Sequence, residues 1–104
     1  MNRILLVDDH PLLREGLTRL ISSESGMMVC GTASSVQEAL AMVEAEKPNL
    51  VITDLTLPGR NGLELIKDLG ATYPEIPTIV LSMHDELFYA ERVLRAGGRG
   101  YVMK

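Results

Sequence analysis

Ile4-Leu5-Leu6-Val7-Asp8-Asp9, near the start of the chain, is a run of four apolar residues that ends in two carboxylates. Leu50-Val51-Ile52-Thr53 is a second such run, and Asp54 follows it. Continuous apolar runs of this length are typical of strands buried on both faces of a parallel sheet. A strand that stops at an Asp brings that Asp to the carboxyl edge of the sheet, where open α/β sheets bind ligands.

Strand-like and helix-like segments alternate along the chain. The predicted strands are Ile4 to Val7, Met27 to Thr32, Leu50 to Thr53, Thr78 to Leu81 and Tyr101 to Met103. The first predicted helix opens at Pro11, and its apolar stripe is Leu12, Leu13, Leu17, Leu20 and Ile21. A capping-box pattern, Ser35-Val36-Gln37-Glu38, opens the second helix. Asn61 is expected to cap the third helix, with Leu63, Ile66 and Leu69 inward, and the fourth runs from about Asp85 to Ala96.

This alternation predicts a parallel sheet with helices on both faces. Such connections are right-handed, so the flavodoxin-like doubly wound strand order 2-1-3-4-5 places the first helix on one face and the next three on the other. One helix does not cover a five-stranded face. We therefore expect a last helix beyond Lys104, or else a partner chain or swapped element on that face. Residues 1–104 are expected to form one domain, truncated after the fifth strand.

Composition limits the possible functions. The chain has 104 residues, which is one small domain, and a net charge of −4 with no basic cluster. Direct binding of nucleic acid by this segment is therefore not expected. The single cysteine, Cys30, excludes an internal disulfide and fits a reducing compartment. No signal peptide or run long enough to span a membrane is present, so a cytoplasmic location is the simplest interpretation.

The predicted strand order makes the first and third strands neighbours, so Asp8, Asp9 and Asp54 should converge at one edge of the sheet. Two carboxylates about 5 Å apart repel by roughly 3 kcal/mol at an effective dielectric near 20, and three of them need a cation. Oxygen ligands favour Mg²⁺ or Mn²⁺, whereas Zn²⁺ is disfavoured because no Cys/His set has suitable spacing. The alternative is that the Asp8-Asp9 pair merely caps the first helix.

Asp54 is the better candidate for a nucleophile, because an Asp carboxylate can accept a phosphoryl group and form an acyl phosphate. The ammonium of Lys104 would balance charge on the transferring oxygens, and Ser82 would hydrogen-bond one of them. The alternatives are that Ser82 is a turn residue and that Lys104 is solvated. His10 could border the acidic site, but simple placement in the loop is the expectation.

Four motifs in order resemble the receiver domain of two-component response regulators, and the resemblance covers the whole chain. They are Val7-Asp8-Asp9-His10, Asp54-Leu55-Thr56-Leu57-Pro58-Gly59-Arg60-Asn61-Gly62, Leu81-Ser82-Met83 and Gly100-Tyr101-Val102-Met103-Lys104. The segment Asp9-His10-Pro11-Leu12-Leu13-Arg14-Glu15-Gly16-Leu17 is also similar to the NarL/FixJ-type subfamily. Regulators of that type usually carry a LuxR-like helix-turn-helix DNA-binding domain, which is not in this chain.

The resemblance implies the chemistry of the site. Asp54 would accept the phosphoryl group from the phosphohistidine of a sensor histidine kinase. Asp9 would bind Mg²⁺ directly and Asp8 through a water molecule, and the backbone carbonyl of Thr56 would be the third protein ligand. Ser82 and Lys104 would contact the phosphoryl group.

The resemblance also implies the output. Ser82 would move toward the phosphate and Tyr101 would turn inward, a small bistable element biased by a new local charge. Homodimerisation on activation is expected, with DNA bound only through the output domain and no membrane partner. Met83 is larger than the residue often found at its position and would narrow access to the phosphoacceptor. Thr56 and His84 occupy positions that in the family tune the lifetime of the phosphoryl group.

Other functions remain open. A haloacid dehalogenase-type phosphohydrolase also uses an Asp nucleophile with Mg²⁺, but it places the nucleophile in an Asp-x-Asp motif after the first strand. A receiver-like module that acts without phosphorylation would not need the set Asp8, Asp9, Asp54, Ser82 and Lys104. A flavodoxin-like cofactor binder would need a phosphate-cradling loop after the first strand, and none follows it. We expect a phosphoacceptor switch and not an enzyme with its own metabolic substrate.

Overall fold

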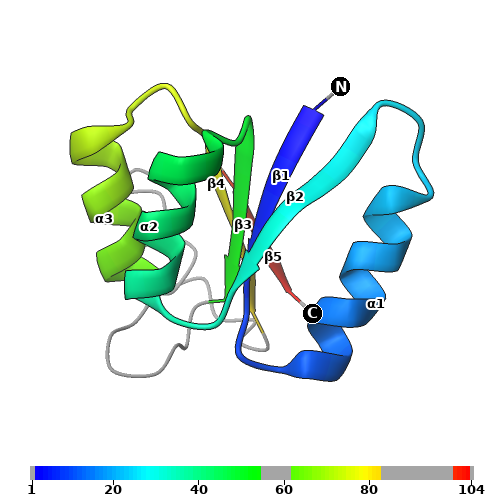
Figure 1. The fold of residues 1–104 in the computed structure, drawn as a ribbon. Coiled ribbons are helices and arrows are strands. Elements are labelled where there is room, and N and C mark those ends of the chain that lie inside the picture. The colour runs from blue at the N-terminus through cyan, green and yellow to red at the C-terminus, as the bar shows by residue number, and fades with distance from the viewer. Residues whose placement is uncertain (1, 55–61, 83–99, 104) are drawn as a thin grey trace.

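The computed structural model describes residues 2–54, 62–82 and 100–103, and these residues form one parallel sheet flanked by helices (Figure 1). The strands are β1 (Asn2–Val7), β2 (Met27–Ala33), β3 (Leu50–Asp54), β4 (Thr78–Ser82) and β5 (Gly100–Met103). The helices are α1 (Pro11–Ser22), α2 (Val36–Glu46) and α3 (Gly62–Thr72). The strand order is β2-β1-β3-β4-β5, which confirms the predicted flavodoxin-like topology.

The helices lie on the two faces of the sheet as right-handed connections require. Figure 1 shows α1 on one side and α2 and α3 together on the other. The predicted helix at 85–96 and the predicted cap at Asn61 lie outside the described residues. A last helix after the fifth strand stays a prediction. In the part of the chain that the structure describes, no helix is both long and apolar enough to cross a membrane.

The main core lies between the sheet and the pair α2 and α3. Alternate residues of β1 and β3 point to this side, because side chains along a strand alternate between the two faces. The buried residues of this cluster are Leu5, Val7, Ala33, Val36, Ala39, Val43, Val51, Leu65 and Leu69. Burial of each large side chain contributes roughly 1.5–3 kcal/mol. The packing of these buried residues therefore fixes the positions of the strand ends that carry the candidate site.

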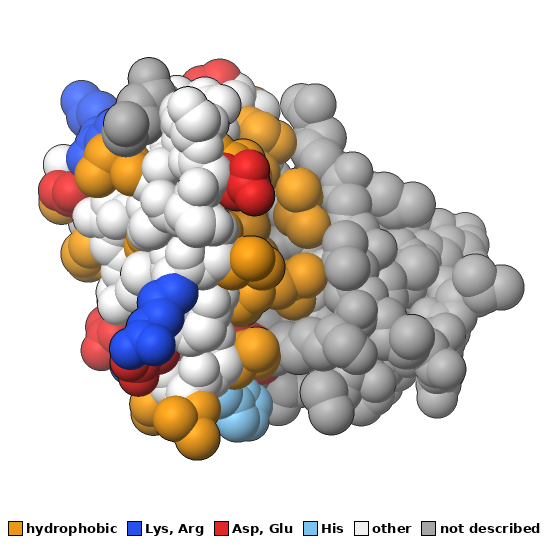
Figure 2. All heavy atoms as spheres, turned by 90° about the vertical axis from the view of Figure 1, so that its right-hand side faces the viewer, with side chains coloured by type: hydrophobic (Ala, Val, Ile, Leu, Met, Phe, Trp, Pro, Cys, Tyr) orange, Lys and Arg blue, Asp and Glu red, His pale blue; other side chains and the backbone are white. Residues whose placement is uncertain are grey.

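On the other face of the sheet, the described residues provide one helix, α1 (Figure 1). Helix α1 has no fully buried residue, and the side chains of Leu12 and Leu20 are 86% and 63% exposed. Part of the apolar stripe of this helix therefore lies at the surface, whereas Leu13 and Leu17 are half-buried. Figure 2, which looks onto the side of α1, shows hydrophobic side chains at the surface there.

The start of α2 is fixed by the predicted cap. The hydroxyl of Ser35 accepts a hydrogen bond from the backbone N–H of Glu38 at 3.2 Å. The carboxylate of Glu38 reaches back one residue further than in a standard capping box, and accepts from the backbone N–H and the hydroxyl of Ser34 at 2.9 and 3.0 Å. These two hydrogen bonds stabilise the ionised carboxylate and lower the pKa of Glu38.

Removing this cap should destabilise the protein measurably. Ser35→Ala is expected to lower the free energy of unfolding by about 1 kcal/mol, because the N–H of Glu38 loses its acceptor. Ser35→Asn is the control, since asparagine keeps a side-chain oxygen that can accept this hydrogen bond and caps helices about as well as serine. Urea unfolding followed by circular dichroism measures both changes, and equal losses in the two variants would contradict the role of the hydroxyl.

Candidate functional site

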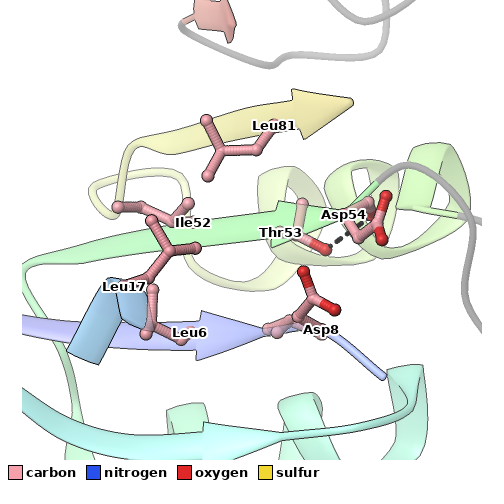
Figure 3. Close-up of a pocket in the computed structure, with 8 residues that line it drawn as sticks. Leu6, Asp8, Leu17, Ile52, Thr53, Asp54 and Leu81 are labelled. Carbon is pink, nitrogen blue, oxygen red and sulfur yellow. Dashed lines mark hydrogen bonds between the residues drawn. The ribbon is translucent and has the colours of Figure 1, made fainter. Parts of the chain in front are cut away.

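Two of the predicted carboxylates lie side by side at the carboxyl edge of the sheet. Strands β1 and β3 pair in parallel with Val7 opposite Thr53, so the next residue of each strand, Asp8 and Asp54, emerges at the same level. Figure 3 shows the two carboxylates at the ends of these neighbouring strands. Asp54 is the last residue of β3, which makes this strand one residue longer than predicted. The predicted convergence of Asp8 and Asp54 is confirmed.

These two carboxylates are largely removed from water. The side chains of Asp8 and Asp54 are 5% and 7% exposed, whereas that of Asp9 is 34% exposed. Beneath the two buried carboxylates lies a small pocket (Figure 3), whose apolar lining residues are Leu6, Val7, Leu17, Ile52 and Leu81. Charges interact more strongly in such surroundings than in water. The charges on Asp8 and Asp54 therefore interact more strongly with each other than two carboxylates in water would.

The third carboxylate joins the other two. One oxygen each of Asp8, Asp9 and Asp54, together with Nδ1 of His10, all lie within 4.8 Å of one another. Two full charges at this separation repel by roughly 3 kcal/mol at an effective dielectric near 20. Carboxylate oxygens on a partly open site are donors that suit a small divalent cation such as Mg²⁺. The donor set therefore fits the cation expected from the sequence.

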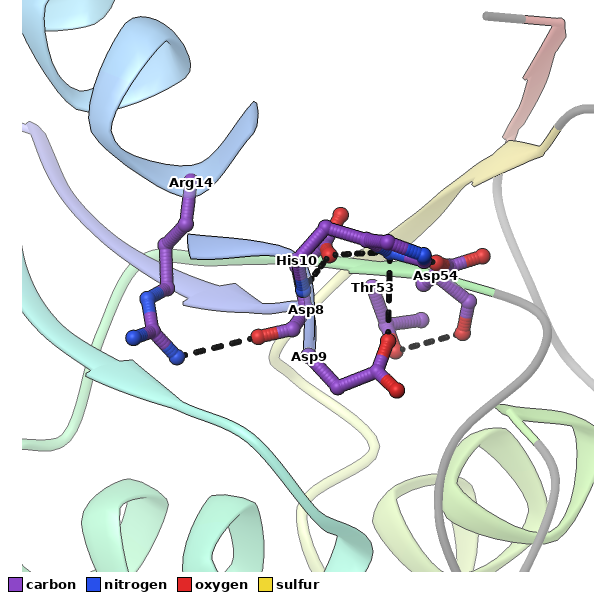
Figure 4. Close-up of polar contacts among 6 residues, drawn as sticks. All are labelled: Asp8, Asp9, His10, Arg14, Thr53 and Asp54. Atoms are coloured by element: carbon purple, nitrogen blue, oxygen red, sulfur yellow. Dashed lines mark hydrogen bonds and ion pairs between the residues drawn. The ribbon is translucent and has the colours of Figure 1, made fainter. Parts of the chain in front are cut away.

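His10 is the site residue that the sequence analysis placed wrongly. Its Nδ1 lies 3.0 Å from Oδ1 of Asp8, 3.2 Å from Oδ1 of Asp9 and 3.6 Å from Oδ2 of Asp54 (Figure 4). The expectation of simple loop placement is therefore wrong. The signal that could have found it is its position directly after the Asp pair, as the N-cap residue of α1, where the chain turns back over the strand end.

Backbone contacts hold the acidic turn in place. The backbone N–H of Asp8 donates to the carbonyl of Ala33 in β2 at 2.9 Å, and its carbonyl accepts from the guanidinium of Arg14 at 3.1 Å. On β3, the hydroxyl of Thr53 donates to the carbonyl of Asp54 at 3.0 Å (Figure 4). The carboxylates are thus presented by a backbone tied to β2 and α1. A site held this way loses little entropy when it binds a ligand.

The remaining predicted residues are only partly placed. Ser82 is the last residue of β4 and pairs with Met103, and Tyr101 pairs with Val80. Strands β4 and β5 therefore end at the same edge as β1 and β3, as predicted. The predictions for Thr56, Met83, His84 and Lys104 lie outside the described residues.

Neutralising one carboxylate should relieve the repulsion. Asp9→Asn is expected to raise the free energy of unfolding by about 1 kcal/mol at low ionic strength without divalent cations. Added Mg²⁺ should stabilise the unmodified protein more than the variant, because a bound ligand stabilises the state that binds it. Denaturant unfolding with and without Mg²⁺ measures both effects.

Glu75→Gln is the matched control for this test. It removes the same charge from an exposed turn residue before β4. A gain equal to that of Asp9→Asn would assign the effect to overall net charge. An unchanged or lower stability of Asp9→Asn would contradict the repulsion at the site.

Known proteins share this sequence pattern. The family model for the response regulator receiver domain matches residues 4–104. The transcriptional regulatory protein DegU of Brevibacillus brevis is 35% identical over 102 residues, which are 98% of this chain and 43% of DegU. The response regulator GacA of Pseudomonas viridiflava is 38% identical over 104 residues, which are 100% of this chain and 49% of GacA. The chain therefore spans about half the length, or less, of these relatives.

A solved structure shows the same fold. The crystal structure of a LuxR-family two-component response regulator from Aurantimonas sp. SI85-9A1 matches with a TM-score of 0.96 and 36% sequence identity. The match covers 100% of this chain and 74% of the other. The resemblance that the sequence motifs indicate is confirmed by all three comparisons.

Proposed function

The chain belongs to the response regulator receiver domain family, and from this premise we propose that it is a phosphorylation-driven switch with Asp54 as the phosphoacceptor. One observation carries the proposal. Asp54 ends β3 beside Asp8 and Asp9, in a pocket that shields its carboxylate from water on one side. A nucleophile fixed at a sheet edge next to cation ligands is the arrangement that phosphoryl transfer to a carboxylate requires.

In the proposed reaction, a carboxylate oxygen of Asp54 attacks the phosphorus of a phosphohistidine on a sensor histidine kinase. The P–N bond breaks and its electron pair stays with the imidazole, while a new P–O bond forms and gives an acyl phosphate. The buried backbone of β3 holds the attacking oxygen in position. Such positioning removes much of the entropic barrier of a bimolecular step.

The neighbouring residues would manage the charge. Asp8, Asp9 and Asp54, with the backbone carbonyl of Thr56, would hold Mg²⁺ or Mn²⁺. When bound, the cation would offset the carboxylates and polarise the phosphoryl oxygens. The proposed cation site is supported by the set of carboxylate ligands that the fold brings together. We assign contacts with the phosphoryl group to Ser82 and Lys104.

The switch would lie on the next two strands. Ser82 ends β4 and Tyr101 lies on the adjacent β5, so an event at the phosphoryl group would reach both. We propose that their movement controls homodimerisation and a DNA-binding output domain. DegU, which is a transcriptional regulatory protein more than twice as long as the matched region, supports an output of this kind.

The position of the nucleophile separates this proposal from a phosphohydrolase. The haloacid dehalogenase type has its nucleophile after the first strand, whereas here Asp54 ends β3 and the residues after β1 are the adjacent pair Asp8 and Asp9. A receiver-like module that works without phosphorylation would not require Asp54 to lie among cation ligands.

The test is phosphorylation by acetyl phosphate, followed by intact mass spectrometry. The protein should gain one phosphoryl group in the presence of Mg²⁺ and none with a chelator. Asp54→Ala should gain none under either condition, while Glu75→Ala, an exposed acidic residue away from the site, should behave like the unmodified protein.

Other results would point elsewhere. No adduct on a protein shown to be folded would favour the phosphorylation-independent module. Turnover of a phosphomonoester that depends on Asp8 would favour the hydrolase. Full labelling of Asp54→Ala would assign the phosphoacceptor to another residue.

A further inference from the structure

His10 is the one side chain of the acidic cluster that the proposed phosphoryl transfer leaves without a task. Resting on that proposed function, we infer that Nδ1 of His10 is an additional protein ligand of the cation site. This ligand makes the site prefer a divalent transition metal of the Mn²⁺ type over Mg²⁺. His10 is thus a specificity-determining residue for the cation.

The spacing of the donor atoms supports this assignment. In an octahedral shell with metal–ligand bonds of about 2.1 Å, neighbouring ligand atoms lie about 3.0 Å apart. The Nδ1 atom lies 3.0 Å from Oδ1 of Asp8 and 3.2 Å from Oδ1 of Asp9, close to that separation. Its distance of 3.6 Å to Oδ2 of Asp54 falls between that of adjacent and opposite ligands. The nitrogen therefore lies close enough to all three carboxylates to meet a cation that they share.

The fold aims the imidazole at the site. The backbone N–H of His10 donates to Oδ1 of Asp8 at 2.7 Å, and Pro11 directly after it favours the extended conformation observed at His10. The ring lies on the solvent side, with 63% of the side chain exposed, above the buried carboxylates of Asp8 and Asp54. It can therefore turn its Nδ1 lone pair toward a cation, with the proton on Nε2 facing water, without disturbing the core.

The chemistry of the donors sets the preference. Mg²⁺ favours oxygen ligands and retains several waters, so an imidazole adds little to its binding. First-row transition metals bind imidazole well and also accept carboxylates. Three carboxylates alone would hold either kind of ion. A nitrogen ligand added to these oxygen ligands should make Mn²⁺ bind more tightly than Mg²⁺.

The experiment is a titration of the intact protein with Mn²⁺, followed by electron paramagnetic resonance, with Mg²⁺ as the competitor. The unmodified protein should bind Mn²⁺ with a ¹⁴N coupling in the pulsed spectrum. His10→Phe keeps a ring of similar size without the ligand, and the ratio of Mn²⁺ to Mg²⁺ affinity should fall at least about tenfold, with loss of the coupling. His10→Gln is a second variant, and circular dichroism verifies that each protein is folded.

Arg19→Ala is the matched control, because Arg19 lies on α1, the helix that follows His10, in an exposed ion pair with Glu15. Its affinity ratio should equal that of the unmodified protein. Mn²⁺ bound without ¹⁴N coupling, and with the same ratio in both His10 variants, would overturn the inference and leave the proposed phosphoacceptor function intact. Tighter Mg²⁺ binding by His10→Phe would also overturn it, because His10 would then compete with the cation. No binding of either ion to the unmodified protein would overturn the cation-dependent function itself.

Discussion

The parallel pairing of β1 with β3 is the constraint on which the site depends. Four residue pairs, from Ile4 opposite Leu50 to Val7 opposite Thr53, set the register between the two strands. A slip by one residue would turn every side chain of β3 to the other face, because side chains alternate along a strand. The register is fixed by the buried residues that the pairing brings together, Leu5 and Val51 among them. The geometry of the candidate site is therefore a consequence of core packing.

The same pairing works against electrostatic stability. It brings Asp8 and Asp54 together in a place where water screens them poorly, and Asp9 adds a third negative charge. The backbone N–H of His10, which donates to Oδ1 of Asp8 at 2.7 Å, offsets part of this repulsion. Proteins tolerate such local conflict at functional sites when the rest of the fold compensates. In the proposed function, this concentration of charge would attract a cation, and the cation would in turn favour the arrival of a phosphoryl group.

Much of the fold follows from local patterns in the sequence. The apolar runs predict the strands, and Ser35 with Glu38 predicts the start of α2. The strand order is one of the two common orders of doubly wound sheets, and the handedness of the connections then places α1 on one face and α2 and α3 on the other (Figure 1). The exposure of Leu12 and Leu20 could not be predicted, because helical periodicity shows that a face is apolar but not that a neighbouring element covers it. Exposure depends on contacts that the sequence pattern does not contain.

The candidate site was predicted in its carboxylates but not in its imidazole. Asp8, Asp9 and Asp54 are marked by their positions at strand ends. His10 follows the strand end by two residues, and its direction depends on the turn into α1. The regular alternation of side chains along a strand predicts on which face each side chain lies. The direction of a side chain in a turn depends on the local backbone conformation, which the sequence pattern does not give. For the same reason the sequence suggested Mg²⁺ or Mn²⁺ without a means to separate them.

The most direct test of the account is to locate the phosphoryl group after labelling. Borohydride reduces an acyl phosphate to the alcohol, so a phosphorylated Asp is converted into homoserine and can be found by peptide sequencing in a mass spectrometer. The account predicts homoserine at residue 54 alone. Homoserine at residue 8 or 9, or a phosphoryl group on His10 that resists borohydride, would contradict it.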